Sequence, residues 1–463
     1  MTHRAEVNEL SVDVAVIGWG KAGKTLAGAL GRAGRRVALV ERSPQMYGGT
    51  CINVACVPTK ALVHRSSMRR KDDDPQTWFT AAVEERDALI GKLNAKNHAM
   101  LDVVDTVTLI DGAARFVGPH EVEVSAGSDR LRVTAETIVI NTGTEPAHLE
   151  VPGADRDHVH DSTTLQHVDP LPKRLVIVGA GYVGLEFAGM FAGFGSQVTV
   201  LDRNERFMAR EDDDVADGVR ALLEERGVRL VLGAGVEQIT EDHVIASGEA
   251  YDADAVLVAT GRTPVTRDLG LDAAGVETDD RGYVRVDEHL RTTVPGVFAV
   301  GDVNGGPQFT YVSLDDHRIV LDQLTGDGSR TTTDRVAVPM TTFLTPPLSR
   351  VGLDETRARE RGGPVLVATK AVADIAAMPR PKLLGETHGL IKVIVDGETD
   401  LVLGATVWCT DSQEVINLVA LAMRAGVTAG RLRDGVWTHP SSTEALNEVL
   451  GGLVPLGEAR PRR

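Results

Sequence analysis

The sequence predicts an α/β fold made of two similar parallel-sheet units and a separate C-terminal α+β region. A turn of the pattern Gly-x-Gly-x-x-Gly follows a β-branched run and precedes a helix-like stretch twice, at residues 18–23 and 179–184. No such turn occurs after about residue 338. A chain of 463 residues is also too long for one hydrophobic core. We therefore expect two Rossmann-like dinucleotide-binding domains and one further domain.

The first unit places its glycine turn between a strand and a helix. Gly18 and Gly20 let the backbone approach a pyrophosphate at the helix N-terminus, and Gly23 lets the helix pack closely on the strand. Glu41 ends the next strand, 23 positions after Gly18, where a carboxylate can bind a ribose hydroxyl pair. The expected strand, turn, helix and second strand are 12–17, 18–23, 24–33 and 36–40. Together they predict a dinucleotide site.

The second unit repeats this order with a carboxylate at the same spacing, because Asp202 follows Gly179 by 23 positions. Asp202 favours NADH, since a carboxylate binds a free 2′-hydroxyl and repels a 2′-phosphate. Arg203 and Arg206 lie close enough to make the preference over NADPH modest. The alternative is that this unit is a decayed duplicate. Its expected strands are 174–178 and 197–201, and its turn glycines are Gly179, Gly181 and Gly184.

Further short elements surround the two units. Residues 61–100 are polar and helix-permissive, and residues 103–139 alternate short apolar runs with turns, as a small sheet would. Each nucleotide unit closes with a strand and a Thr-Gly turn, at Gly143 and at Gly261. A further apolar run ends at Asp302, a geometry suited to a hydroxylated cofactor chain. The alternative for Asp302 is an ordinary turn aspartate.

Two of the three cysteines, Cys51 and Cys56, lie five positions apart behind a Gly-Gly-Thr sequence. Because a helix rises 1.5 Å per residue, their Cα atoms would lie roughly 7 Å or more apart, at or beyond the reach of a disulfide. They can bridge only if the first helical turn is distorted, and such a bond is reducible and tends to be catalytic. A thiolate at a helix N-terminus also has a lowered pKa. We predict a redox-active dithiol; the alternative is two unrelated buried cysteines.

Composition excludes several classes of function. The net charge of -17 disfavours a nucleic-acid or anionic-membrane partner. Residues 175–195 are almost entirely apolar, but they contain Glu186 and several glycines and fit a strand entering a packed helix, so we expect no membrane segment. Three cysteines and a start without an apolar signal core favour a cytoplasmic location.

The chain changes character from about residue 338 and predicts an α+β domain. Ser441, followed three residues later by Glu444, is a capping box, which leaves His439 unexplained. The expected strands are 389–395 and 401–408, and the expected helices are 412–425 and 442–450.

The chain resembles the flavoprotein disulfide reductases over essentially its whole length. The resemblance rests on both glycine turns, the Cys-x-Asn-x-x-Cys-x-Pro-Thr-Lys motif that begins at Cys51, the Gly-Asp at 301–302 and the terminal His-Pro that begins at His439. This group includes dihydrolipoamide dehydrogenase, glutathione reductase and mercuric reductase, and it implies FAD, a nicotinamide cofactor and a homodimer. Residues 46–51 and 309–316 look most like the mercuric-reductase-like branch, particularly the bacterial reactive-chlorine resistance reductases.

The resemblance also implies domains and cofactor-binding residues. It implies an FAD-binding domain in two parts (1–150 and 266–337), an NAD(P)-binding domain (151–265) and a dimerisation domain (338–463). The residues implied to bind FAD are Gly18, Gly20, Gly23, Glu41, Gly49, Thr50, Lys60, Gly143 and Asp302. The residues implied to bind NAD(P) are Gly179, Gly181, Tyr182, Gly184, Asp202 and Gly261, with Tyr182 covering the nicotinamide pocket.

The implied catalytic residues at the flavin are the dithiol and an ion pair. Cys56 would sit against the flavin as the charge-transfer thiolate, and Cys51 would be the outer thiol that meets the acceptor. Lys60 lies four residues after Cys56, hence on the same helical face, and would pair with Glu186.

His439, oriented by Glu444, would be the acid/base at the outer thiol, which its ordinary pKa near 6.5 suits. Because His439 and Cys51 belong to different domains, the active sites would be shared across a two-fold homodimer. No resident metal is implied.

The departures from the family pattern limit what it implies about the acceptor. Ala55 stands where the family usually has glycine, which either restricts the loop or shows that φ is negative there. Residues 451–463 contain no cysteine, unlike the C-terminal pairs of mercuric and large thioredoxin reductases, so both activities are disfavoured. Residues 309–316 also differ from those of lipoamide and glutathione enzymes, and Cys409 has no assigned role.

Two dinucleotide units beside a dithiol indicate an electron path in which hydride enters from a nicotinamide, crosses a flavin and leaves through sulfur. The leading hypothesis is an NAD(P)H oxidoreductase that reduces a disulfide or an oxidised thiol, a small-molecule acceptor, in oxidant defence. The second is a cupric or mercuric ion reductase that uses the same dithiol. The third is a non-catalytic flavoprotein that senses redox state through a partner.

Overall fold

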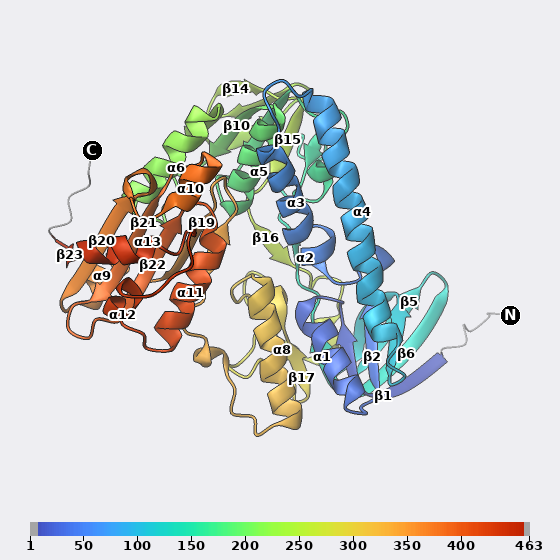
Figure 1. The fold of residues 1–463 in the computed structure, drawn as a ribbon. Helices are drawn as coiled ribbons and strands as arrows, with labels where there is room; N and C mark the ends of the chain where they lie inside the picture. The colour runs from blue at the N-terminus through green and yellow to red at the C-terminus, as the bar shows by residue number, and fades with distance from the viewer. Residues whose placement is uncertain (1–7, 458–463) are drawn as a thin grey trace.

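The computed structural model describes residues 8–457. Figure 1 shows three parts: a blue and cyan sheet with its helices near the N-terminus, a green unit, and an orange-to-red unit near the C-terminus. Across the described residues, no helix combines the length and the apolar character that a membrane crossing requires.

A seven-stranded sheet forms the first nucleotide unit, in the order β3-β2-β1-β6-β5-β4 with β17 beside β6. Its central strand β1 runs parallel to β2 and β6. Val14 and Val16 of β1 join one apolar cluster and Ala15 and Ile17 join another, because both faces of the strand are covered. The strands are β1 (Asn8–Ile17), β2 (Val37–Glu41), β3 (Val107–Asp111), β4 (Ala113–Gly118), β5 (Glu121–Ala126), β6 (Asp129–Ile140) and β17 (Val297–Ala299).

The expectation of a small sheet over residues 103–139 is wrong in part. β3 joins the main sheet in parallel with β2, and the second half of β6 pairs with β1. β4, β5 and the first half of β6 form an antiparallel meander. A short apolar run carries no mark of its pairing partner, so composition could not separate these strands.

The second nucleotide unit is a parallel five-stranded sheet in the order β11-β10-β9-β15-β8. Helix α5 (Tyr182–Phe194) follows the glycine turn directly and buries Phe187, Phe191 and Phe194. It ends at Gly195, whose φ of +113° is a left-handed cap. The strands are β8 (Val159–His160), β9 (Arg174–Val178), β10 (Gln197–Asp202), β11 (Val228–Leu232) and β15 (Ala255–Val258), and helix α6 (Asp213–Glu225) follows β10.

The C-terminal unit is an antiparallel six-stranded sheet in the order β18-β19-β22-β21-β20-β23. Helix α11 (Ser412–Arg424) packs Val415, Ile416 and Val419 into its core. The other elements are β18 (Met340–Thr342), β19 (Leu348–Gly352), α9 (Glu355–Arg361), β20 (Val365–Ala371), β21 (Leu390–Asp396), β22 (Val402–Trp408), α13 (Ala445–Val449) and β23 (Val454–Pro455).

Helix α13 begins three residues later than the expected helix at 442. Glu444 accepts a hydrogen bond from the backbone N–H of Ser441 at 2.8 Å, but the buried Ser441 hydroxyl bonds to no described residue. The expected capping box is therefore only half formed. The carboxylate of Glu444 is held by Ser441 and by the ring of His439, which lie before the helix.

The longest helix, α4 (Pro75–Asp102), spans the two nucleotide units (Figure 1). Phe79 and Ala82 near its start belong to the apolar core of the second unit. Leu101 at its end belongs to the core of the first, packed with Leu26 and Leu30 of α1 (Lys21–Arg32). One helix thus connects both cores.

Candidate active site

The redox loop is the break between two helices. Cys51 lies in the short helix α2 (Thr50–Asn53), and Cys56 is the first residue of α3 (Cys56–Ser67). Ala55 between them has φ −128° and ψ −98°. The negative φ explains why alanine can stand where the family usually has glycine. The helical distortion that a Cys51–Cys56 bridge requires is present, with both cysteines as free thiols.

The pKa values of the two thiols are shifted in opposite directions. The hydrogen bond from Cys51 lowers the pKa of Cys56 to about 6, with further help from the Thr310 hydroxyl at 3.6 Å and the charge of Lys60. The same hydrogen bond, together with burial, raises the pKa of Cys51. At neutral pH, Cys56 is therefore a thiolate at the N-terminus of α3, and Cys51 is a protonated thiol.

Side chains from the loop itself and from two distant segments hold the redox loop. Asn53 Nδ2 donates to the Gly49 carbonyl at 2.9 Å, and Lys24 Nζ donates to the Gly48 carbonyl at 3.2 Å. Gln166 Nε2 donates to the carbonyl of Val54, inside the break, at 3.1 Å. The geometry of the dithiol therefore depends on α1 and on the segment between β8 and β9 of the second unit.

Lys60 and Glu186 join α3 to α5. Lys60 Nζ lies 2.6 Å from Glu186 Oε2, the contact expected from the sequence. Glu186 Oε1 accepts a hydrogen bond from the backbone N–H of Phe343 at 2.8 Å, so the carboxylate also reaches the C-terminal unit. The side chain of Glu186 is only 7% exposed, and its charge is balanced by Lys60.

The first glycine turn is closed around Asn141. Gly18 has φ +101°, and a Cβ there would overlap the backbone carbonyl of Asn141. At Gly23 a Cβ would lie 2.5 Å from Asn141 Nδ2. Glu41, whose pKa is raised by burial, accepts a hydrogen bond from the backbone N–H of Trp19 at 3.0 Å. The carboxylate thus lies directly beside the turn.

The second glycine turn has the same geometry with one open position. Gly179 has φ +108°, and a Cβ at Gly184 would overlap the turn's own backbone. A Cβ at Gly181 would meet no described atom within 4 Å. Asp202 Oδ2 accepts a hydrogen bond from the backbone N–H of Ala180 at 2.7 Å. The second unit therefore has the turn geometry and the carboxylate that a nucleotide site requires.

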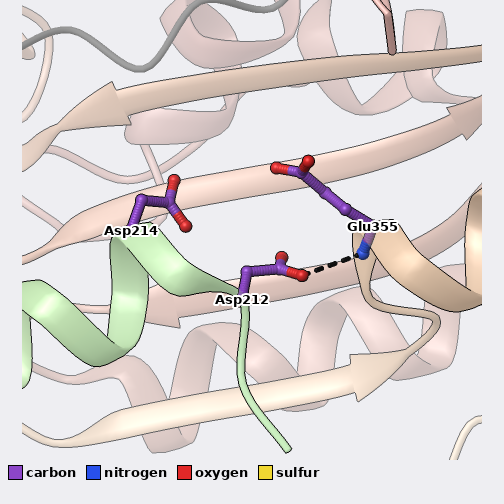
Figure 2. A group of neighbouring side chains, drawn as sticks. All are labelled: Asp212, Asp214 and Glu355. Atoms are coloured by element: carbon purple, nitrogen blue, oxygen red, sulfur yellow. Dashed lines mark hydrogen bonds between the residues drawn. The ribbon is translucent and has the colours of Figure 1, made fainter. Parts of the chain in front are cut away.

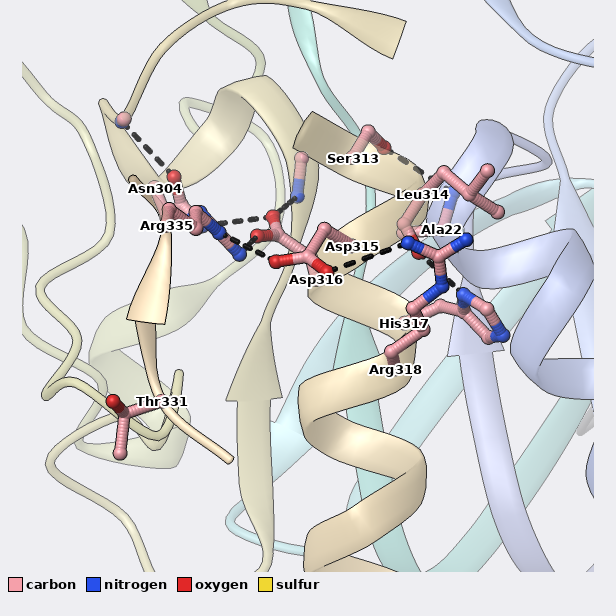
Figure 3. A network of polar contacts seen from close by, with 12 residues as sticks. Ala22, Asn304, Ser313, Leu314, Asp315, Asp316, His317, Arg318, Thr331 and Arg335 are labelled. Atoms are coloured by element: carbon pink, nitrogen blue, oxygen red, sulfur yellow. Dashed lines mark hydrogen bonds and ion pairs between the residues drawn. The ribbon is translucent and has the colours of Figure 1, made fainter. Parts of the chain in front are cut away.

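Helix α8 (Thr310–Thr325) ties the first unit together (Figure 3). Asp316 Oδ2 accepts a hydrogen bond from the backbone N–H of Gly301 at 2.6 Å, and Ser313 Oγ accepts one from Ala22 N–H at 3.2 Å. Arg335 forms an ion pair with Asp316. The helix therefore holds the first glycine turn and the Gly301 turn in fixed relation.

Asp302 lies next to that turn. Its Oδ2 accepts a hydrogen bond from Thr144 Oγ1 at 3.2 Å, and burial raises its pKa although Arg262 lowers it. A partly buried carboxylate with one oxygen that bonds to no described residue is suited to a ligand hydroxyl.

A cavity of about 2760 Å³ joins these parts. The predicted site residues that line it are Gly18, Gly20, Glu41, Gly49, Thr50, Cys51, Cys56, Lys60, Gly143, Tyr182, Glu186 and Asp302. The predicted residues that the described lining does not include are Gly23, Gly179, Gly181, Gly184, Asp202, Gly261, His439 and Glu444. Within one chain the cavity thus unites the dithiol with the first glycine turn and reaches the start of α5.

His439 lies apart from this cavity. Its Nδ1 is 2.9 Å from Glu444 Oε1, and its side chain is 70% exposed. The expected His–Glu contact is therefore present, without contact to the dithiol of the same chain among the described lining residues.

Two family models match the chain: pyridine nucleotide-disulphide oxidoreductase over residues 12–316, and its dimerisation domain over residues 338–450. The chain belongs to the pyridine nucleotide-disulphide oxidoreductase family. It is an NAD(P)H-dependent flavoprotein disulfide oxidoreductase with a dimerisation domain, built from FAD- and NAD(P)-binding Rossmann-like domains.

Individual relatives are similar over nearly the whole chain. The probable pyridine nucleotide-disulfide oxidoreductase RclA of Escherichia coli (strain K12) is 45% identical over 440 residues, covering 94% of this chain and 98% of the relative. Mercuric reductase of Lysinibacillus sphaericus is 32% identical over 462 residues, covering 96% and 82%. The solved Cu(II) complex of the HOCl-induced flavoprotein disulfide reductase RclA from E. coli has a TM-score of 0.91 and 44% identity, covering 96% and 99%.

The residues present fit both family cofactors. The first turn would hold FAD through the glycines that a Cβ would block, through the buried carboxylate of Glu41 and through the partly buried carboxylate of Asp302. The second would hold NAD(P) at the open Gly181 and at Asp202. FAD, when bound, supplies the ring that passes a hydride equivalent from nicotinamide to sulfur.

Sequence reasoning missed four residues at the site: Thr310, Asn141, Gln166 and Asp316. Thr310 lies 254 positions from Cys56 in the chain, so no local pattern connects them. Its only signal in the sequence was the segment 309–316, which looks like the mercuric-reductase-like branch and differs from the lipoamide and glutathione enzymes.

Proposed function

We propose that this enzyme uses NADH to reduce a disulfide or an oxidised-thiol product, a small-molecule acceptor, as part of oxidant defence. The similar RclA is described as HOCl-induced, which supports the oxidant-defence part of the proposal. The observation that carries the proposal is the pair of opposite pKa shifts at Cys56 and Cys51 inside one cavity with Lys60 and Glu186. One thiolate beside one protonated thiol suits a dithiol that reacts with an acceptor, whereas a structural disulfide does not require this difference.

Reduction of a disulfide acceptor would proceed by two thiol–disulfide exchanges. Cys51, once deprotonated, attacks one acceptor sulfur, and the acceptor S–S bond breaks to release a first thiolate that takes up a proton. The Cys56 thiolate then attacks the Cys51 sulfur of the mixed disulfide and releases the second thiolate. The products are a Cys51–Cys56 disulfide and two acceptor thiols. Two electrons from NADH return the disulfide to the dithiol.

Deprotonation of Cys51 needs a base, because its surroundings raise its pKa. We assign this role to His439, held by Glu444 and provided by a second copy of the chain. The match to a dimerisation domain and the exposure of His439 outside its own chain's cavity support a shared site.

The test is NADH consumption by purified, FAD-loaded protein with small disulfides, cupric and mercuric salts, and quinones. We expect disulfide reduction in the wild type and its loss in Cys51→Ser. Cys409→Ser is the matched control. Cys409 is fully buried and is not among the described residues that line the cavity, so this variant should keep its activity. Equal disulfide-dependent NADH consumption in wild type and Cys51→Ser would contradict the proposal.

A second candidate is reduction of a cupric or mercuric ion by the same dithiol, since thiolates are soft ligands. The solved Cu(II) complex of the similar RclA favours copper. The same assay separates the two: metal-dependent, Cys51-dependent NADH consumption without turnover of any disulfide would support the metal reductase. Slow turnover with every acceptor would instead support a redox sensor.

A further inference from the structure

A cluster of charged side chains joins the second nucleotide unit to the C-terminal unit beside the cavity. Residues 211–214, at the start of α6, face three residues of the C-terminal unit. These are Arg350 on β19, Glu355 at the start of α9 and Lys392 on β21.

Lys392 is the buried centre of this cluster and pairs with three carboxylates. Its side chain is 1% exposed, and its Nζ lies 3.0 Å from Asp212, 2.7 Å from Asp214 and 2.6 Å from Glu355. Figure 2 shows these three carboxylates converging from α6 and α9. The Lys392 ammonium supplies the positive charge that the carboxylates require, so the cluster binds the two units to each other and does not call for a metal ion.

Arg350 forms the second part of the cluster, mostly through longer contacts than those of Lys392. It pairs with Glu211 at 3.4 Å and donates to the Arg210 carbonyl at 2.9 Å. It also donates to the hydroxyl of Tyr182 at 3.2 Å. The Tyr182 hydroxyl donates in turn to Glu211 at 3.5 Å. The 3.5 Å contact is long and the 3.2 Å bond lies at the upper end of the normal range, so together they are worth about one hydrogen bond of ordinary net strength.

Tyr182 lies where a nucleotide would pass from the second glycine turn to the dithiol. It is the first residue of α5, directly after the open Gly181, and it lines the cavity. Glu186, one helical turn later on the same face, bonds to Lys60, which lies one turn after Cys56. A ring carried by a dinucleotide at the second turn therefore meets Tyr182 before it reaches the Lys60–Glu186 pair.

We propose that Arg350 and Glu211 form a latch across the domain boundary that holds the Tyr182 ring over the nucleotide side of the cavity. Arg350 is then a positioning residue that acts through Tyr182, and Lys392 anchors the boundary on which the latch depends. The inference rests on the proposed function, because it gives the second glycine turn a dinucleotide ligand.

The test compares Tyr182→Phe, the paired change Arg350→Met with Glu211→Gln, and all three changes together, each in FAD-loaded protein. The paired change removes both charges at once, so that no buried charge is left alone if Arg350→Met by itself fails to fold. The readouts are the Kd for NAD⁺ by calorimetry and the split between KM and kcat with NADH.

In this proposal the contacts of the Tyr182 hydroxyl with Arg350 and Glu211 break when the nucleotide displaces the Tyr182 ring. A variant without these contacts does not have to break them. Tyr182→Phe and the paired change should each lower the Kd for NAD⁺ by about two- to tenfold, the range for one hydrogen bond of ordinary net strength. The combined variant should bind no tighter than either, because both changes remove the same contacts of the Tyr182 hydroxyl. The KM for NADH should fall in parallel.

Arg220→Met is the matched control, since Arg220 pairs with Glu224 within α6 on the surface. An unchanged or raised Kd in Tyr182→Phe, additive effects in the combined variant, or an equal shift in the control would each overturn the latch. If the wild type neither binds NAD⁺ nor reduces its flavin with NADH, the proposed function fails instead.

Discussion

At the scale of single residues, neighbours decide the chemistry of two identical side chains. Cys56 gains a hydrogen bond from Cys51, a helix N-terminus, the Thr310 hydroxyl and a nearby lysine, while Cys51 gives up its proton less readily because a thiolate lies beside it. The sequence could predict that the pair is redox-active. It could not predict that Thr310 lowers the pKa of Cys56 or that Gln166 holds the loop, because both come from segments more than a hundred residues away.

The first prediction is the pH dependence of Cys56 alkylation. The thiolate is the reactive form and persists above a pKa of about 6, so its reaction with iodoacetamide should slow as pH falls. The rate in the reduced protein should be about tenfold lower at pH 5 than at pH 7. Peptide mass spectrometry measures the two cysteines separately. Thr310→Val should move the midpoint upward, and Thr310→Ser is the control. A wild-type midpoint above pH 8 would show that Cys56 is an ordinary thiol.

The second prediction concerns Asp202 and the nicotinamide cofactor. The wild type should prefer NADH over NADPH in kcat/KM by a modest factor, because Arg203 is exposed nearby while Arg206 is paired with Asp213 at 2.6 Å. Asp202→Asn removes the charge that repels a 2′-phosphate and should lower the NADH-to-NADPH ratio by about tenfold, roughly 1.4 kcal/mol of discrimination. Steady-state kinetics with both cofactors measures the ratio. A clear preference of the wild type for NADPH would refute this interpretation of Asp202.

At the scale of elements, local sequence patterns predicted the helices, strands and turns that depend on neighbouring residues. The strand–turn–helix units lie where the glycines and β-branched runs indicate, although α1 begins at Lys21 rather than at residue 24 because Gly20 serves as its N-cap. Pairing was harder to predict: β3 lies in the main sheet because of its partner β2, which no property of its five residues specifies. Helix α13 starts three residues later than expected, and the Ser441 hydroxyl makes no capping bond to any described residue there.

The third prediction tests the α3–α5 contact. Lys60→Met leaves the buried Glu186 carboxylate with only the Phe343 N–H, and it should lower the free energy of unfolding by about 2 kcal/mol, less than a fully buried pair because Lys60 is 31% exposed. Lys60→Met combined with Glu186→Gln should recover most of this loss. Urea unfolding of the FAD-loaded protein measures both. A single variant as stable as the wild type would mean that the pair adds nothing to stability.

At the scale of the whole molecule, an assembly prediction follows from the distance of His439 from the cavity of its own chain. A heterodimer of one Cys51→Ser chain and one His439→Ala chain would place both defects in one shared site and leave the other intact. Isolated with two different tags, it should regain about half of wild-type activity with an acceptor that needs both residues, by the site count of two-fold symmetry. Homodimers of each variant are the controls. Activity no higher than in these homodimers would rule out shared sites.

The helix α4 braces the two nucleotide units against each other. It is a rod of 28 residues, about 42 Å long, fastened in the core of the second unit at one end and in the core of the first at the other. Asn94, between these ends, holds the carbonyls of Pro44, Gln45 and Tyr47, just before the redox loop. Because both ends of α4 are packed in apolar cores, we expect the two units to keep their spacing while electrons pass between them. In such a braced frame the nicotinamide and the acceptor would react at separate times, and the dithiol would hold two electrons between the two reactions.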